Sequence, residues 1–234
     1  TTATFIYDST SPVTVIQDPN NKYERSLGTI FGTAGDLGAG LKSALQEVKV
    51  AILDTGTTKY WNGAGAWVSY TPPLPRDSPA WLTASGTIWG NETANWSLTG
   101  ASTPTWVSGD VYEIRVRAQD RSLNYQLPIT SFTFTYDTKA PVTQITEPNT
   151  LRENQLLTTI SGTARDYSDA GETKLGEIDL VEIRIQRAPP LGNYWDGVAF
   201  TTPPANAEYA WFTPQGLSPT STFWYHPFPA WDEN

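Results

Sequence analysis

The sequence predicts an all-β protein built from β-sandwich domains, and three observations support that prediction. Short runs alternate apolar residues with polar or charged ones, which is the pattern of a strand with one buried face. Clusters of Gly, Pro, Asn, Asp and Ser separate these runs, and the 234 residues include 18 Gly and 18 Pro. Several blocks of sequence also recur, which predicts two copies of one domain.

The repeat sets the expected domain organisation. Three blocks of the first half return in the same order in the second half: 5–13 at 134–142, 32–34 at 162–164, and 60–63 at 194–197. We expect a terminal strand and linker at 1–11, one sandwich at 12–137 and a second at 138–234. The proline that follows each linker holds the preceding residue extended, so the linkers should be short and stiff.

Four runs of alternating apolar residues are predicted to be strands: 48–52, 112–118, 131–136 and 181–185. One further segment, 41–46, is expected to form at most a short helical turn. The second copy has no counterpart of 112–118 or 131–136, so two interpretations are open. The chain is either a window on a longer repeat protein, or a neighbouring subunit supplies strands by strand addition. In the second case residues 1–8 would be one donor, pairing with the open edge near 209–231.

Composition excludes several classes of function. The absence of Cys excludes disulfides, a thiolate nucleophile and Cys-ligated metal sites. The net charge of −9 argues against nucleic acid and anionic membranes as partners, and it is compatible with divalent cations. No apolar run approaches the roughly 20 residues that a membrane-spanning helix needs.

Catalytic signals are weak. His226 is the only histidine, and no Gly-x-Ser-x-Gly elbow accompanies it. No pair of carboxylates stands out from the 24 acidic residues as a hydrolase pair. We therefore expect that the protein is not an enzyme and requires no cofactor for catalysis.

Three motifs, in order, carry a family resemblance. They are Tyr-Asp-x-x-x-Pro at 7–12 and 136–141, Gly-Thr-Ala-x-Asp at 32–36 and 162–166, and the strand and turn at 112–124. The arrangement resembles tandem immunoglobulin-like repeats of large bacterial cell-surface proteins, over nearly the whole chain. The resemblance implies sandwiches of about seven strands. It also implies an extracellular stalk, adhesin or filament whose partners are copies of itself or neighbouring repeats, head to tail. The segment 70–96 is extra relative to such repeats.

A calcium site follows from this resemblance. In such a sandwich the second strand ends at the pole where the linker arrives, and the turn between the last two strands lies there too. The candidate ligands are Asp8, Asp36, Asp120 and Asn124 in the first copy, and Asp137, Asp166 and Asp169 in the second. Ca²⁺ takes hard oxygen ligands of this kind, and its binding would stiffen the junction. Asp and Asn also favour turns for local reasons, and that interpretation stays open.

Two aromatic pairs suggest an alternative function. Tyr60-Trp61 and Tyr194-Trp195 each precede an Asn-Gly or Asp-Gly turn, and exposed rings there could stack on sugars. The chain would then be a carbohydrate-binding or adhesive accessory module that recognises surface glycans. Their recurrence at matched positions also fits a structural role at a strand end, and burial of the rings would favour that role.

Overall fold

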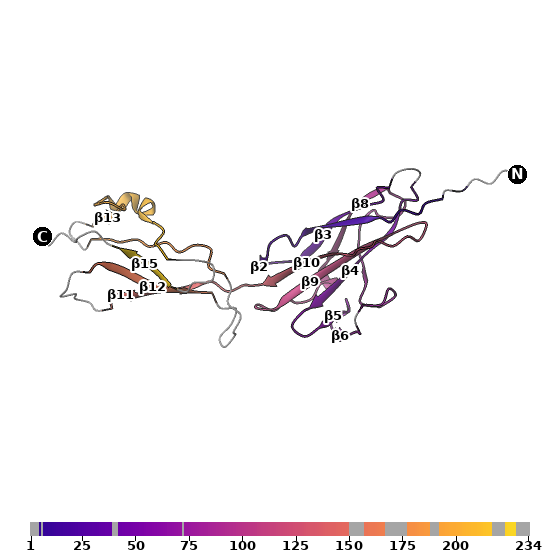
Figure 1. Cartoon of the computed structure of the whole chain (residues 1–234), viewed down its shortest axis with the longest axis horizontal. Helices are drawn as coiled ribbons and strands as arrows, with labels where there is room; N and C mark the ends of the chain where they lie inside the picture. The colour runs from indigo at the N-terminus through magenta and orange to yellow at the C-terminus, as the bar shows by residue number, and fades with distance from the viewer. Residues whose placement is uncertain are drawn as a thin grey trace. The chain divides into compact units, whose positions relative to one another are not determined.

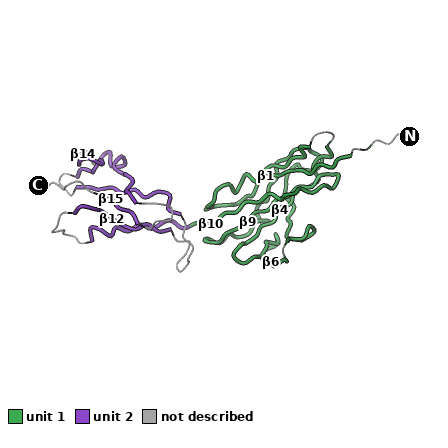
Figure 2. Tube along the Cα trace, in the orientation of Figure 1, with its two compact units in different colours: residues 1–138 green, residues 139–234 purple. Residues whose placement is uncertain are grey.

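The computed structural model shows a mostly β protein (Figure 1). It describes residues 5, 7–38, 42–71, 73–149, 157–166, 177–187, 192–216 and 223–227. The chain divides into two compact units, Thr1–Thr138 and Lys139–Asn234, coloured separately in Figure 2. The break falls within the linker-like segment 137–141.

Unit 1 contains two sheets. The smaller has the order β1-β3-β8, with strands at Val13–Asp18, Thr29–Gly35 and Thr93–Thr99. The larger has seven strands in the order β2-β10-β9-β4-β5-β6, with β7 also paired to β4. Its strands are β2 (Tyr23–Glu24), β4 (Leu45–Asp54), β5 (Lys59–Trp61), β6 (Trp67–Ser69), β7 (Leu82–Thr83), β9 (Val111–Asp120) and β10 (Thr130–Tyr136). A 3₁₀ turn, η1, spans Gly100–Ser102.

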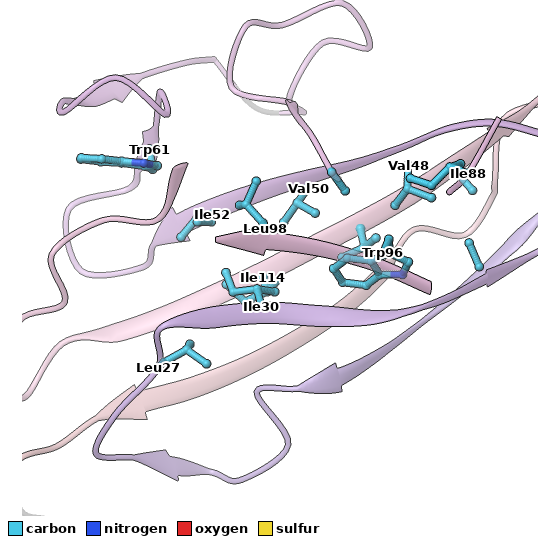
Figure 3. Packing of buried hydrophobic residues seen from close by; sticks show 14 of the residues in the cluster. Leu27, Ile30, Val48, Val50, Ile52, Trp61, Ile88, Trp96, Leu98 and Ile114 are labelled. Atoms are coloured by element: carbon cyan, nitrogen blue, oxygen red, sulfur yellow. The ribbon is translucent and has the colours of Figure 1, made fainter. Parts of the chain in front are cut away.

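The main core of unit 1 lies between these sheets. Figure 3 shows Ile30 of β3 and Trp96 of β8 beside Ile114 of β9. The Trp96 ring lies over Gly32, where a Cβ would overlap both the indole and the backbone oxygen of Val15. The Trp96 indole also donates from Nε1 to the oxygen of Thr33 at 3.0 Å. Glycine at position 32 is therefore what lets tryptophan pack directly on the sheet.

Three of the predicted strands in unit 1 are confirmed, and one prediction is wrong. The runs 48–52, 112–118 and 131–136 lie inside β4, β9 and β10. The helical turn expected at 41–46 does not form over its described part, because Leu45 is fully buried and begins β4 opposite Asp120. Burial of Leu45 in the sheet outweighs the weak helical preference of the segment.

The segment 70–96 forms β7 and the start of β8, and it contributes to a second, smaller core. Val48, Val50 and Ile52 of β4 face the main core, whereas Ala51 belongs to a cluster with Tyr60, Ala80 and Trp81. Successive residues of a strand point to opposite faces, so this cluster covers the outer face of the larger sheet. The guanidinium of buried Arg117 stacks there, 4.3 Å from the Trp81 ring centroid.

Unit 2 repeats the smaller sheet of unit 1. Its order is β11-β12-β15, with strands at Val142–Glu147, Thr159–Arg165 and Phe223–Pro227. Val142 pairs with Arg165 as Val13 pairs with Gly35, and both ladders shift register after the fourth pair. Trp224 lies over Gly162, where a Cβ would overlap its ring, as at Gly32 in unit 1.

The rest of unit 2 is less regular. β13 (Tyr194–Trp195) pairs with β14 (Phe200–Thr202), and the 3₁₀ segment η2 spans Pro204–Ala210. The predicted strand at 181–185 forms no continuous ladder among the described residues. Isolated bridges, Ile183 to Phe212 and Gln186 to Tyr194, hold it in place. In unit 1 the corresponding strand β4 gains its regularity by pairing with β9 along nearly its whole length.

Candidate metal centre in unit 1

Three carboxylates gather where the entering segment meets unit 1. Asp8 lies before β1, Asp36 directly follows β3, and Asp120 is the last residue of β9. One side-chain oxygen from each lies within 4.8 Å of those of the other two. The structure thus brings together three residues that are far apart in sequence, as the calcium hypothesis predicts.

Asp36 is the most deeply placed of the three. Its side chain is 0 % exposed, and its backbone N–H donates to the oxygen of Glu92 at 2.8 Å. Oδ2 accepts a hydrogen bond from the Ala44 N–H at 3.0 Å. Oδ1 is buried and has no hydrogen-bond partner. A buried carboxylate oxygen without a donor is costly, and a cationic ligand at this atom would offset that cost.

Asp120 is also 0 % exposed and is held by the turn that follows β9. Its Oδ1 accepts from the Asn124 backbone N–H at 2.9 Å, and its Oδ2 accepts from Asn124 Nδ2 at 2.8 Å. Asn124 Nδ2 also donates to the Asp8 backbone oxygen at 3.0 Å. Asn124 therefore acts here as a donor that ties Asp8 to Asp120, whereas the sequence suggested an oxygen ligand.

Asp8 comes from the linker and is fixed by its neighbours. Oδ1 accepts from the Thr10 N–H at 2.9 Å and from Thr10 Oγ1 at 2.6 Å. Oδ2 accepts from the Ser43 N–H at 2.9 Å. Thr10 and Ser43 were missed by the sequence analysis. The Asp-x-Thr pattern at 8–10 is a local turn signal that could have indicated Thr10, but nothing in the sequence indicates the contribution of Ser43.

The pKa values of Asp36 and Asp8 are shifted in opposite directions. Burial, together with the charges of Asp8 and Asp120, raises the pKa of Asp36 above its ordinary value. Hydrogen bonds, above all from the Thr10 hydroxyl, lower the pKa of Asp8 to about 2. None of the three carboxylates pairs with a Lys or Arg of the described chain. The site therefore concentrates negative charge in a place with little access to water.

These residues fit a hard divalent cation. All the candidate ligands are oxygens, which Ca²⁺ and Mg²⁺ prefer, whereas zinc favours His and Cys. Ca²⁺–oxygen bonds of about 2.3–2.6 Å place two ligands of one ion at most about 5 Å apart, so a spacing within 4.8 Å can be spanned. The unpaired Asp36 Oδ1 would gain the partner that it lacks.

The second set of candidate ligands stays a prediction. Asp137 belongs to unit 1 and Asp166 to unit 2, and Asp169 lies outside the described residues. Among the residues that the structure describes, the acidic group at Asp8, Asp36 and Asp120 is the one with metal-site spacing.

The aromatic pairs are not available to a carbohydrate. Tyr60, Trp61, Tyr194 and Trp195 are all buried. Trp61 packs edge-on against Trp67 with centroids 5.5 Å apart, and Trp195 packs in the same way against Phe200 at 5.2 Å. The sugar-binding prediction for these four residues is therefore wrong, because the rings are buried against other side chains and cannot offer a free face.

Comparisons with known proteins give no family for this chain. No family model matches it, and no curated protein sequence matches it. Across the described part of the chain, no helix has both the length and the apolar character needed to cross a membrane.

Proposed function

We propose that this chain is a structural segment of an extracellular repeat protein. In this proposal its sandwiches are immunoglobulin-like repeats, and calcium fixes the linker to the sandwich that follows it. The observation that carries the proposal is the convergence of Asp8, from the linker, with Asp36 and Asp120, from the ends of two core strands. An ion held by all three would join the linker to both sheets of unit 1.

The chemistry of the site supports a mechanical role. Without the ion, the three carboxylates repel one another, and the pKa of Asp36 is raised first by burial and then by this repulsion. With the ion, the same charges attract one centre, and the free energy of binding adds to that of folding. Calcium sites of extracellular modules typically have dissociation constants of about 10⁻⁴–10⁻³ M, which suits a protein that works at millimolar calcium outside the cell.

Calcium titration of the full chain tests the proposal. We expect calcium to raise the unfolding temperature of unit 1. At a calcium concentration 100 times the dissociation constant, the free energy of unfolding should increase by about 2.7 kcal/mol. Magnesium should act more weakly, because it demands near-octahedral geometry and dehydrates reluctantly. Calorimetry would supply the stoichiometry, expected to be one ion for unit 1.

Two variants locate the effect. Asp36→Asn should abolish the calcium-dependent shift, because it removes a buried anionic ligand. Asp77→Asn is the matched control, since the Asp77 side chain is 84 % exposed and pairs with Arg76, which is not one of the candidate ligands. An unchanged unfolding temperature of the parent chain at saturating calcium would contradict the proposal. So would an equal loss of the shift in both variants.

A further inference from the structure

Unit 2 exposes a sheet surface that unit 1 covers. β1 and β11 occupy matched places, with the same register against their neighbours β3 and β12. In unit 1 Thr14 is buried and Ile16 packs against the main core. Their counterparts by register are Thr143 and Ile145; Thr143 is exposed, and Ile145 is 61 % exposed.

The cover in unit 1 is the β9–β10 hairpin. β1 contacts both strands of this hairpin. Thr130 of β10 donates from Oγ1 to the backbone oxygen of Thr14 at 2.9 Å, and the two hydroxyl oxygens are 3.0 Å apart. β9 meanwhile pairs antiparallel with β4, with Val50 opposite Val116. One hairpin thus closes one face of β1 and one edge of β4.

Among the described residues of unit 2, the segment 181–185, which corresponds to β4, has a partner on one edge only. On one side, Ile183 exchanges backbone hydrogen bonds with Phe212, and Ile185 accepts from Trp195, as β4 pairs with β7 and β5 in unit 1. Backbone groups of alternate residues point to opposite edges, so Glu182 and Arg184 present theirs on the other side. No described strand pairs with them there. Unpaired strand edges of this kind are templates for strand addition.

We propose that unit 2 is a docking site for a β-hairpin that pairs with the Glu182–Arg184 edge and covers Ile145. The occupant is an antiparallel hairpin of the β9–β10 type, with apolar residues at alternate positions to meet Val181, Ile183 and Ile145. Among the described residues the hairpin of this pattern, β9–β10, is already packed into unit 1, so the occupant is a hairpin of a partner polypeptide that is not a second copy of this chain. This inference does not depend on the calcium site, which lies in unit 1.

A designed extension tests it. The full chain is extended by a flexible Gly-Ser linker and a second copy of residues 111–136. Hydrogen exchange is then measured at the amides of Glu182 and Arg184, with unit 1 amides as the folding reference. We expect exchange at both sites to slow by about tenfold or more, because a docked strand gives these amides partners and opening then requires undocking. Unchanged exchange would overturn the proposal.

Two substitutions on β11 provide matched controls. Ile145→Glu in the extended protein should abolish the protection, because it places a charge under the hairpin. Val142→Glu should leave it intact, since Val142 is 68 % exposed and its counterpart Val13 stays 47 % exposed in unit 1, where the hairpin is present. Equal effects of both would overturn the proposal. Self-association of the unextended chain with protection of Glu182 and Arg184 would also overturn it, by making a second copy the occupant.

Discussion

Asn124 donates its side-chain Nδ2 to the backbone oxygen of Asp8 at 3.0 Å, across 116 residues of sequence. The same nitrogen also donates to Oδ2 of Asp120. One amide group therefore joins the linker to the last residue of a central strand. The arrangement positions Asp8 and Asp120 before any ion binds.

Removing this amide should weaken both the fold and the metal site. We expect Asn124→Ala to lower the free energy of unfolding of unit 1 by about 1–2 kcal/mol without calcium, because Asp120 and Asp8 each lose a hydrogen bond. Calcium affinity should fall several-fold, since Asp8 is no longer preorganised. Urea unfolding with and without calcium measures both effects. A variant with unchanged apo stability would show that the hydrogen bonds to Asp8 and Asp120 contribute little.

The free energy of unfolding of unit 1 should first rise and then fall as the pH is lowered through the acidic range. The pKa of Asp36 is raised above the 3.8 of the unfolded chain. Its protonation therefore favours the folded state, and calcium-free stability should increase as pH falls from neutral through that raised pKa. The pKa of Asp8 is lowered to about 2. Its stabilising contribution should be lost as pH falls below 3.8 toward that value.

Calcium should abolish the first of these two effects, because the ion requires ionised Asp36. The stabilisation by calcium should accordingly shrink as pH falls through the raised pKa of Asp36. Denaturant unfolding at a series of pH values, with and without calcium, is the measurement. In Asp36→Asn the calcium-free rise should be smaller and not absent, because Asp18 of unit 1 also has a pKa raised by burial and by Glu24. An unchanged rise would show that Asp36 does not contribute to it.

Matched glycine substitutions should destabilise one unit at a time. A Cβ at Gly32 would overlap the Trp96 ring and the Val15 oxygen, and a Cβ at Gly162 would overlap the Trp224 ring. We expect each of Gly32→Ala and Gly162→Ala to cost about 1–3 kcal/mol in its own unit, since overpacking forces backbone shifts. Calorimetry of the full chain should show one shifted transition per variant. Gly28→Ala is the control, because Gly28 has no positive φ and no atom within 4 Å of the added carbon.

The second, smaller core of unit 1, which covers the outer face of the larger sheet and is called the outer core below, should contribute substantially to the stability of unit 1. Trp81→Ala removes a buried ring from the cluster with Ala51 and Tyr60 and also uncovers Arg117. The expected loss is about 3–5 kcal/mol in the free energy of unfolding of unit 1. Trp89→Ala is the control, because Trp89 is largely exposed. A similar loss in the free energy of unfolding in both variants would show that the buried Trp81 ring stabilises unit 1 no more than an exposed ring does.

The strands of the larger sheet could be predicted because their side chains alternate. β9 and β10 each have one face in the main core, and that one-sided burial imposes a period of two. The run at 181–185 alternates equally well, yet it forms only isolated bridges in the structure. Alternation of apolar and polar side chains predicts which face of a strand is buried, but it does not predict whether a partner strand pairs with its edge.

The candidate site could be predicted in part. Asp8, Asp36 and Asp120 follow from strand ends and the linker, because topology brings those points together. The donors Ser43 and Ala44 could not be predicted, since their backbone N–H groups carry no residue signature. The outer core was also beyond prediction. Trp81 belongs to a segment without periodicity, and its burial depends on the small side chain of Ala51 on the outer face of β4.

The attachment of Asp8 has a consequence for how tension enters unit 1. β1 is an edge strand of the smaller sheet and is held by one ladder, to β3. Asp8 precedes β1 and is bonded to Asn124, next to Asp120 at the end of β9, which lies between β10 and β4 in the larger sheet. A force applied before Asp8 is therefore shared between β1 and an interior strand that is hydrogen-bonded on both sides.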